Sequence, residues 1–196
     1  MNFALAATTF AVIIPAELPD KTFIAAVVMS ARNRPLPVWI GAAAGLIVQA
    51  LVGVVAGRLL ALLPHRSVEG IVAALFLLGG GYLLLTRERA VVRAGEGLAE
   101  AVGAAASARV ALRAFGLIAF AEFGDLTQVV IANLTARSGD PLSVLVGAAL
   151  AFVLLSAVAV LAGRTLVRHV SLALVRRISG VVLVGLGVWS LVGALG

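Results

Sequence analysis

Six long apolar segments constrain what this chain can fold into. A helix needs roughly 20 mostly apolar residues to cross the hydrocarbon core of a bilayer. Stretches of that kind cover residues 3–29, 36–62, 68–86, 112–134, 142–163 and 177–195. Only 12% of the 196 residues are charged, whereas about a quarter are charged in an average soluble domain. The sequence therefore predicts an all-α integral membrane protein with six transmembrane helices.

The two halves of the chain repeat one another. With one inserted residue, the matched pairs are Glu17 and Glu122, Asp20 and Asp125, Thr22 and Thr127, Arg32 and Arg137, Pro35 and Pro141, Gly41 and Gly147, and Gly57 and Gly163. Each half holds three predicted helices, and because three is odd, the second half must enter the membrane from the opposite side. We predict two inverted-topology repeats, 1–86 and 112–196, joined by a linker at 87–111. Such repeats are typical of secondary transporters.

The arginines predict the orientation of the chain. Most of them lie in three predicted loops, at 30–35, 87–113 and 164–177. The loops on the other side hold Arg58, Arg66 and Arg137. Because arginine accumulates in cytoplasmic loops, we expect the linker in the cytoplasm and both termini outside. The abundance of Ala, Gly and Arg favours a bacterial inner membrane. The same asymmetry accounts for the net charge of +6, which therefore does not indicate a nucleic-acid partner.

Two acidic pairs lie near the middle of predicted spans, Glu17 with Asp20 and Glu122 with Asp125. Residues three apart share one face of a helix, and a charge at this depth costs roughly 3 kcal/mol or more. Lys21 is the one cation at this depth. It is the predicted counter-ion, and we expect it to pair with Glu17, four residues earlier. One lysine cannot neutralise four carboxylates, so the cluster predicts a site for cations and protons.

The side chains available at this depth carry only oxygen ligands. Besides the four acids, the further candidate ligands are Thr22, Thr127, Gln49 and Gln128, and Gln49 is equally compatible with an interhelical hydrogen bond. All-oxygen sites suit hard divalent ions such as Mg²⁺, Ca²⁺ and Mn²⁺. Crowded carboxylates cannot all be ionised together, so such a site is expected to exchange metal for protons.

Helix-breaking residues flank both acidic pairs. Pro15 and Pro19 surround Glu17, and Gly124 lies between Glu122 and Asp125. A proline inside a helix removes a backbone hydrogen bond and bends the helix. Broken helices near the middle of the membrane bring backbone carbonyls to a bound ion in transporters. We therefore expect a local break at each acidic pair.

The two acidic stretches read ELPDKT at 17–22 and EFGDLT at 122–127. They resemble the paired E-x-G-D-[KR]-[TS] motifs of the six-helix cation–proton exchangers of the Golgi, chloroplast and bacterial manganese and calcium type. The resemblance covers the whole chain. It implies an antiporter rather than an enzyme. This antiporter would export Mn²⁺, or Ca²⁺ as the second choice, in exchange for protons, and would need no cofactor beyond the transported ion. It also implies that Glu17, Asp20, Glu122 and Asp125 form the metal site. The chain departs from the motif at Pro19 and at Leu126, where a balancing positive charge is lost.

Two other functions are compatible with the residues. An intramembrane aspartyl protease would use Asp20 and Asp125 as its catalytic pair, but that leaves Glu17 and Glu122 without a role. A small-solute exporter of the amino-acid type would require a larger polar pocket and fewer clustered acids. A homo-oligomer is compatible with each of these functions.

Overall fold

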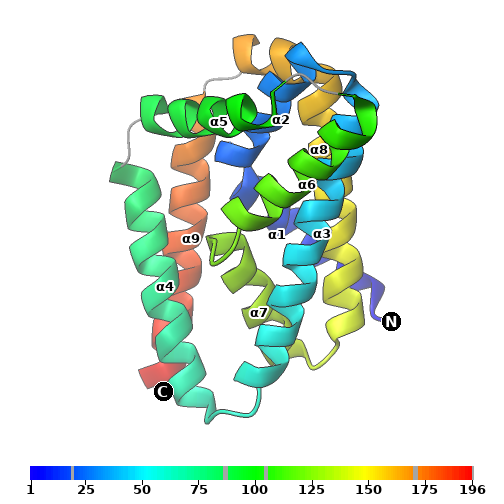
Figure 1. Cartoon of the computed structure of the whole chain (residues 1–196). Helices are drawn as coiled ribbons and strands as arrows, with labels where there is room; N and C mark the ends of the chain where they lie inside the picture. The colour runs from blue at the N-terminus through cyan, green and yellow to red at the C-terminus, as the bar shows by residue number, and fades with distance from the viewer. Residues whose placement is uncertain (19, 86–87, 104–105, 170–171, 196) are drawn as a thin grey trace.

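The computed structural model of the chain describes all residues except 19, 86–87, 104–105, 170–171 and 196 (Figure 1). The helices are α1 Phe3–Glu17, α2 Lys21–Arg32, α3 Pro35–Leu60, α4 His65–Leu85, α5 Glu88–Val102, α6 Ser107–Ala121, α7 Leu126–Ser138, α8 Pro141–His169 and α9 Leu172–Leu195. No strand occurs among the described residues. The protein is an all-α membrane protein. Two helical stretches, Pro35–Leu60 and Pro141–Leu161, are each long and apolar enough to cross a bilayer.

The predicted spans at 3–29 and 112–134 are each two helices rather than one. The chain leaves the helical path between Glu17 and Lys21, and α6 and α7 meet at an angle of 71°. If each bent pair is one span, α6 with α7 forms a third candidate crossing. Gly124 has a φ of +78° in the second break, a backbone conformation that glycine adopts without steric cost. Pro19 lies outside the described residues.

Each long helix packs on the broken helix of the other half. α3 lies against α6 and α7, and α8 lies against α1 and α2. A Cβ atom added at Gly41 in α3 would collide with the Ala111 carbonyl in α6, and one added at Gly147 in α8 would collide with the Ala6 carbonyl in α1. Glycine at these two positions lets the helix backbones approach closely. The contacts are reciprocal, since each pairs equivalent positions of the two halves.

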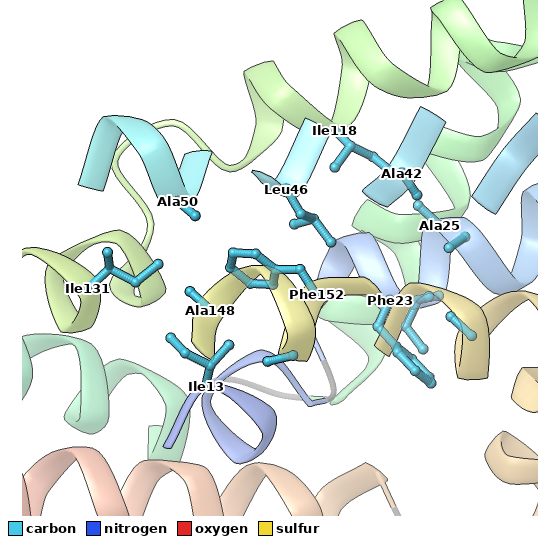
Figure 2. Packing of buried hydrophobic residues seen from close by; sticks show 14 of the residues in the cluster. Ile13, Phe23, Ala25, Ala42, Leu46, Ala50, Ile118, Ile131, Ala148 and Phe152 are labelled. Atoms are coloured by element: carbon cyan, nitrogen blue, oxygen red, sulfur yellow. The ribbon is translucent and has the colours of Figure 1, made fainter. Parts of the chain in front are cut away.

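A buried apolar cluster fills the centre of the bundle, where α3 and α8 meet the broken helices (Figure 2). Phe152 lies between Ile13, Leu46 and Ala148 in this view. Phe152 is 2% exposed and Ile13 is fully buried. The cluster packs the helices of both halves together, which fixes the broken segments beside one another.

The chain termini lie at one end of the molecule and α5 lies across the other (Figure 1). The backbone N–H of Asn2 donates hydrogen bonds to Asp140 Oδ2 at 3.2 Å and to Ser143 Oγ at 2.7 Å. The stretch assigned to the linker is largely helical, since it contains α5, and α6 begins within it at Ser107. α5 packs on α2 through Gly95, which lies against Ile24.

Candidate cation site

The four acids that match between the two halves lie at the two helix breaks. Glu17 is the last residue of α1 and Asp20 precedes the first residue of α2. Glu122 and Asp125 hold the corresponding places at the end of α6 and the start of α7. Both breaks contain the same turn. The Asp20 N–H donates to the Glu17 carbonyl at 2.9 Å, and the Asp125 N–H donates to the Glu122 carbonyl at 3.2 Å. The local sequence therefore builds two similar breaks, each carrying two acids.

Three of the four predicted acids converge across the two breaks. One carboxylate oxygen from each of Glu17, Glu122 and Asp125 lies within 4.8 Å of the other two. Oxygen ligands of Ca²⁺ lie about 2.3–2.6 Å from the ion, so the oxygens around one ion are within about 5 Å of each other. Asp20 is outside this group of three. The geometry thus fits a carboxylate triad with Asp20 beside it, rather than four equivalent ligands.

Lys21 links the two motifs from the side of Asp20. Its Nζ atom is 3.6 Å from Glu122 Oε1, 3.6 Å from Asp125 Oδ1 and 3.7 Å from Asp20 Oδ2. The expected pairing with Glu17 is not the one that the structure contains. The rule for residues four apart applies within one continuous helix, and the break after Glu17 separates that residue from α2. The lysine is instead placed between acids of both halves, where its charge offsets part of theirs.

The two threonines of the motifs differ in their surroundings. Thr127 Oγ1 donates a hydrogen bond to Glu17 Oε2 at 2.7 Å, which joins the second motif to the first. Thr22 Oγ1 is buried and has no hydrogen-bond partner, and the same is true of Glu17 Oε1 and Glu122 Oε1. Buried polar atoms are nearly always satisfied in folded proteins. Glu122 Oε1 lies 3.6 Å from Lys21 Nζ, whereas a proton, water molecule or cation would satisfy Glu17 Oε1 and Thr22 Oγ1.

A small cavity lies beside Glu17 and Thr22. Its volume is about 10 Å³, and Phe23, Leu46 and Ile118 are among the apolar residues that line it. One water molecule needs about 10–15 Å³ measured in this way. The space next to Glu17 thus accommodates a water molecule or an ion but nothing as large as an amino acid.

The two candidate glutamines brace the second break. Gln49 Nε2 donates to the Ala119 carbonyl, and Gln128 Nε2 donates to Gln49 Oε1. Gln128 Oε1 accepts a hydrogen bond from the Gly124 N–H at 3.0 Å. Of the two roles considered for Gln49, the structure contains the interhelical hydrogen bond. Both amide oxygens already accept hydrogen bonds, so these side chains hold the loop that carries Glu122 and Asp125.

Leu126 occupies the motif position that usually carries a cation. Its side chain lies against Gly79 of α4, where even a Cβ atom would collide with it. The positive charge that the motif loses here is thus replaced by an apolar contact between α7 and α4. Lys21 remains the only cation paired with these acids in the described chain.

An ion pair between Glu69 of α4 and Arg137 of α7 was not predicted from the sequence. Glu69 is 3% exposed. Arg137 also donates to Asn133 Oδ1 at 3.2 Å and to Ser190 Oγ at 3.0 Å, and its guanidinium lies 5.9 Å from the centre of the Trp189 ring. The sequence feature that could have indicated this pair is Glu69, an acidic residue inside the predicted span 68–86. The pair ties α7 to α4 and α9.

The chain is similar to known proteins over most of its length. The family model described as divalent cation/proton antiporter GDT1 matches residues 5–91 and 110–196. The chain is 30% identical over 176 residues to the GDT1-like protein sll0615 of Synechocystis sp. (strain ATCC 27184 / PCC 6803 / Kazusa), which covers 84% of this chain and 85% of that protein. It is 28% identical over 197 residues to the chloroplastic protein PAM71 of Arabidopsis thaliana, covering 89% of this chain and 53% of that protein. No solved structure matches the chain.

Proposed function

Because the chain belongs to the GDT1 family of divalent cation/proton antiporters, we propose that it exchanges Mn²⁺, or next Ca²⁺, for protons and exports the metal from the cytoplasm. The protein is a transporter and not an enzyme. The observation that carries the proposal is the triad of Glu17, Glu122 and Asp125, whose oxygens lie within 4.8 Å of one another. An all-oxygen donor set of this kind favours a hard divalent ion.

The charges at the site connect metal binding to proton binding. The four acids and Lys21 sum to −3 when all are ionised, and one divalent cation reduces this to −1. Without the metal, repulsion among buried carboxylates favours the uptake of protons. Metal entry therefore expels protons, and protonation of the triad expels the metal. Lys21 serves as the resident counter-ion, because it contacts Glu122 and Asp125 and must yield those oxygens to an entering ion.

The architecture that suits this exchange is six membrane crossings in two inverted repeats. Three observations support it. Both breaks contain the same turn, and the contacts of Gly41 and Gly147 are reciprocal. The family match divides into two ranges of equal length, 5–91 and 110–196. Rocking of one half against the other would present the triad alternately to each side. We place the protein in a bacterial inner membrane with α5 on the cytoplasmic side and both termini outside.

Labelling of introduced cysteines tests this orientation, since the chain has no cysteine of its own. A cysteine near residue 95 should react with an impermeant reagent only from the cytoplasmic side. Cysteines near residues 66 and 139 should react only from outside. The opposite pattern would reverse the proposed direction of the chain.

Simultaneous recording of metal and pH in sealed proteoliposomes tests the exchange itself. A pH gradient that is acidic on the side opposite the metal should drive Mn²⁺ uphill, and Mn²⁺ added without a gradient should move protons the other way. Metal flux without a proton signal between about pH 6 and 8 would indicate a channel or uniporter, because the protonation change of the triad would then be uncoupled from transport. Proton-coupled flux of an amino acid with no metal flux would favour the small-solute exporter.

A further inference from the structure

A second cavity lies at the end of the molecule opposite the chain termini. It has a volume of about 480 Å³ and lies between the α2–α3 turn, which contributes Arg32 and Arg34, and the start of α6, which contributes Ser107 and Val110. Both arginines are exposed, no acid lines the cavity, and neither arginine pairs with an acid in the described part of the chain. The cavity shares no lining residue with the cation site, and its polar groups favour an anion.

Two helices begin at this cavity without a side-chain cap. Arg34 is the residue before α3 and Ala106 is the residue before α6, and neither side chain accepts a hydrogen bond from the helix that follows. The first N–H groups of a helix have no partner within the helix. The partial positive charge of these groups at the start of α6 attracts anions and adds to the two guanidinium groups, whereas Pro35 and Pro37 at the start of α3 have no N–H to donate.

The other half of the chain contains the equivalent arrangement with its own anion in place. Asp140 corresponds to Arg34 in the repeat, since each precedes the proline that starts α8 or α3. Asp140 Oδ2 accepts hydrogen bonds from Ser143 Oγ at 2.6 Å and from the Asn2 N–H at 3.2 Å, and Oδ1 accepts one from the Ser143 N–H at 3.1 Å. The hydrogen bonds from Ser143 hold the pKa of Asp140 below its usual range, so the carboxylate is ionised near neutral pH. One carboxylate thus serves the starts of both α1 and α8.

We propose that the Arg32–Arg34 cavity binds the phosphate group of an anionic membrane lipid. The repeat predicts an anion at this position, and the chain supplies an arginine where the other half supplies the carboxylate of Asp140. The residues that follow along α3 and α6 point to a lipid as the source, because Leu36, Ile40 and Leu112 are 61%, 50% and 69% exposed. Acyl chains would cover these side chains while the phosphate contacts the guanidinium groups, which suit bidentate recognition of phosphate.

Lipid binding to the purified full-length chain tests the proposal. The protein in detergent micelles is incubated with phosphatidylglycerol or phosphatidylcholine, and native mass spectrometry counts the lipid molecules that it retains. Thermal unfolding in the same micelles measures how much each lipid stabilises the protein. Arg32→Gln and Arg34→Asp are the test variants. Arg34→Asp also places a carboxylate at the position that Asp140 occupies in the other half of the chain. Arg93→Gln, an exposed arginine on α5 outside the cavity, is the matched control.

We expect the wild type and Arg93→Gln to retain phosphatidylglycerol in preference to phosphatidylcholine. Each test variant should bind it more weakly, by about fivefold for one arginine near an anionic lipid, and Arg34→Asp should remain folded in the thermal assay. Equal retention by all four proteins, or an equal loss in Arg93→Gln, would overturn the proposal in favour of general surface charge. Stabilisation by inorganic phosphate to the same extent, with no preference between the lipids, would identify a soluble phosphate as the ligand and reject the lipid.

Discussion

Adding one methyl group at Gly41 or Gly147 should push apart the packed helices that join the two halves of the transporter. A Cβ atom at Gly41 would lie 2.9 Å from Ala114 Cβ, and one at Gly147 would lie 2.9 Å from Thr9 Cβ, besides colliding with a backbone carbonyl in each case. Carbon atoms in contact are normally about 3.5–4.0 Å apart. The carbonyl opposite each glycine belongs to the backbone and cannot rotate away as a side chain could. The two helices in contact at each glycine must therefore move apart by about 1 Å.

Overpacking of this kind costs about 1–3 kcal/mol. For a chain of this length, each kcal/mol lowers the melting temperature by about 2–4 °C. Gly41→Ala and Gly147→Ala should therefore each lower the melting temperature by roughly 2–12 °C. The two sites involve different helix pairs, so their effects should be additive within about 0.5 kcal/mol. Because α1 ends at Glu17 and α6 ends next to Glu122, the shift should also displace triad ligands and slow metal exchange.

Thermal unfolding of the purified variants, followed by the proteoliposome assay, measures both effects. Gly116→Ala is the matched control, since Gly116 lies in α6 and a Cβ atom there meets nothing within 4 Å. The control should unfold at or slightly above the wild-type temperature, because alanine favours a helix over glycine. Melting temperatures for Gly41→Ala and Gly147→Ala that equal the control would refute the close reciprocal contacts.

Three further predictions concern the site and its supports. Asp125→Asn should abolish Mn²⁺ exchange in protein that still inserts and folds, whereas Asp20→Asn, outside the triad, should retain Mn²⁺ binding in calorimetry; equal loss of binding would make Asp20 a ligand. Gln128→Met, which removes the acceptor for the Gly124 N–H, should weaken Mn²⁺ binding by about fivefold, since such a hydrogen bond contributes about 1 kcal/mol; unchanged binding would mean that the brace does not position the acids. Glu69→Gln should lower the melting temperature by leaving Arg137 without its acidic partner, and exchanging the two charges in a double variant should restore part of the loss; no change in either would contradict a stabilising pair.

The sequence alone was sufficient for the features that depend on local composition. The apolar segments predicted an all-α membrane protein because the cost of transferring a helix into lipid depends on its own side chains. Gly124 predicted the break between α6 and α7, since a positive φ is a property of one residue, whereas Pro15 lies inside α1 and the first break follows Glu17. The two acidic stretches indicated the transporter family. The same local features did not reveal that each break would divide its span into two separate helices.

The tertiary structure alone decided which of these residues meet. Lys21 contacts Glu122 and Asp125, more than 100 positions along the chain, because the long helices α3 and α8 each pack on the other half. The sequence shows arginine at position 34 and aspartate at position 140. The repeat matches these two positions, since each precedes a matched proline. Only the fold shows that Asp140 accepts hydrogen bonds from Asn2 and Ser143 while Arg34 lines a cavity, because these surroundings come from segments that are distant in the chain.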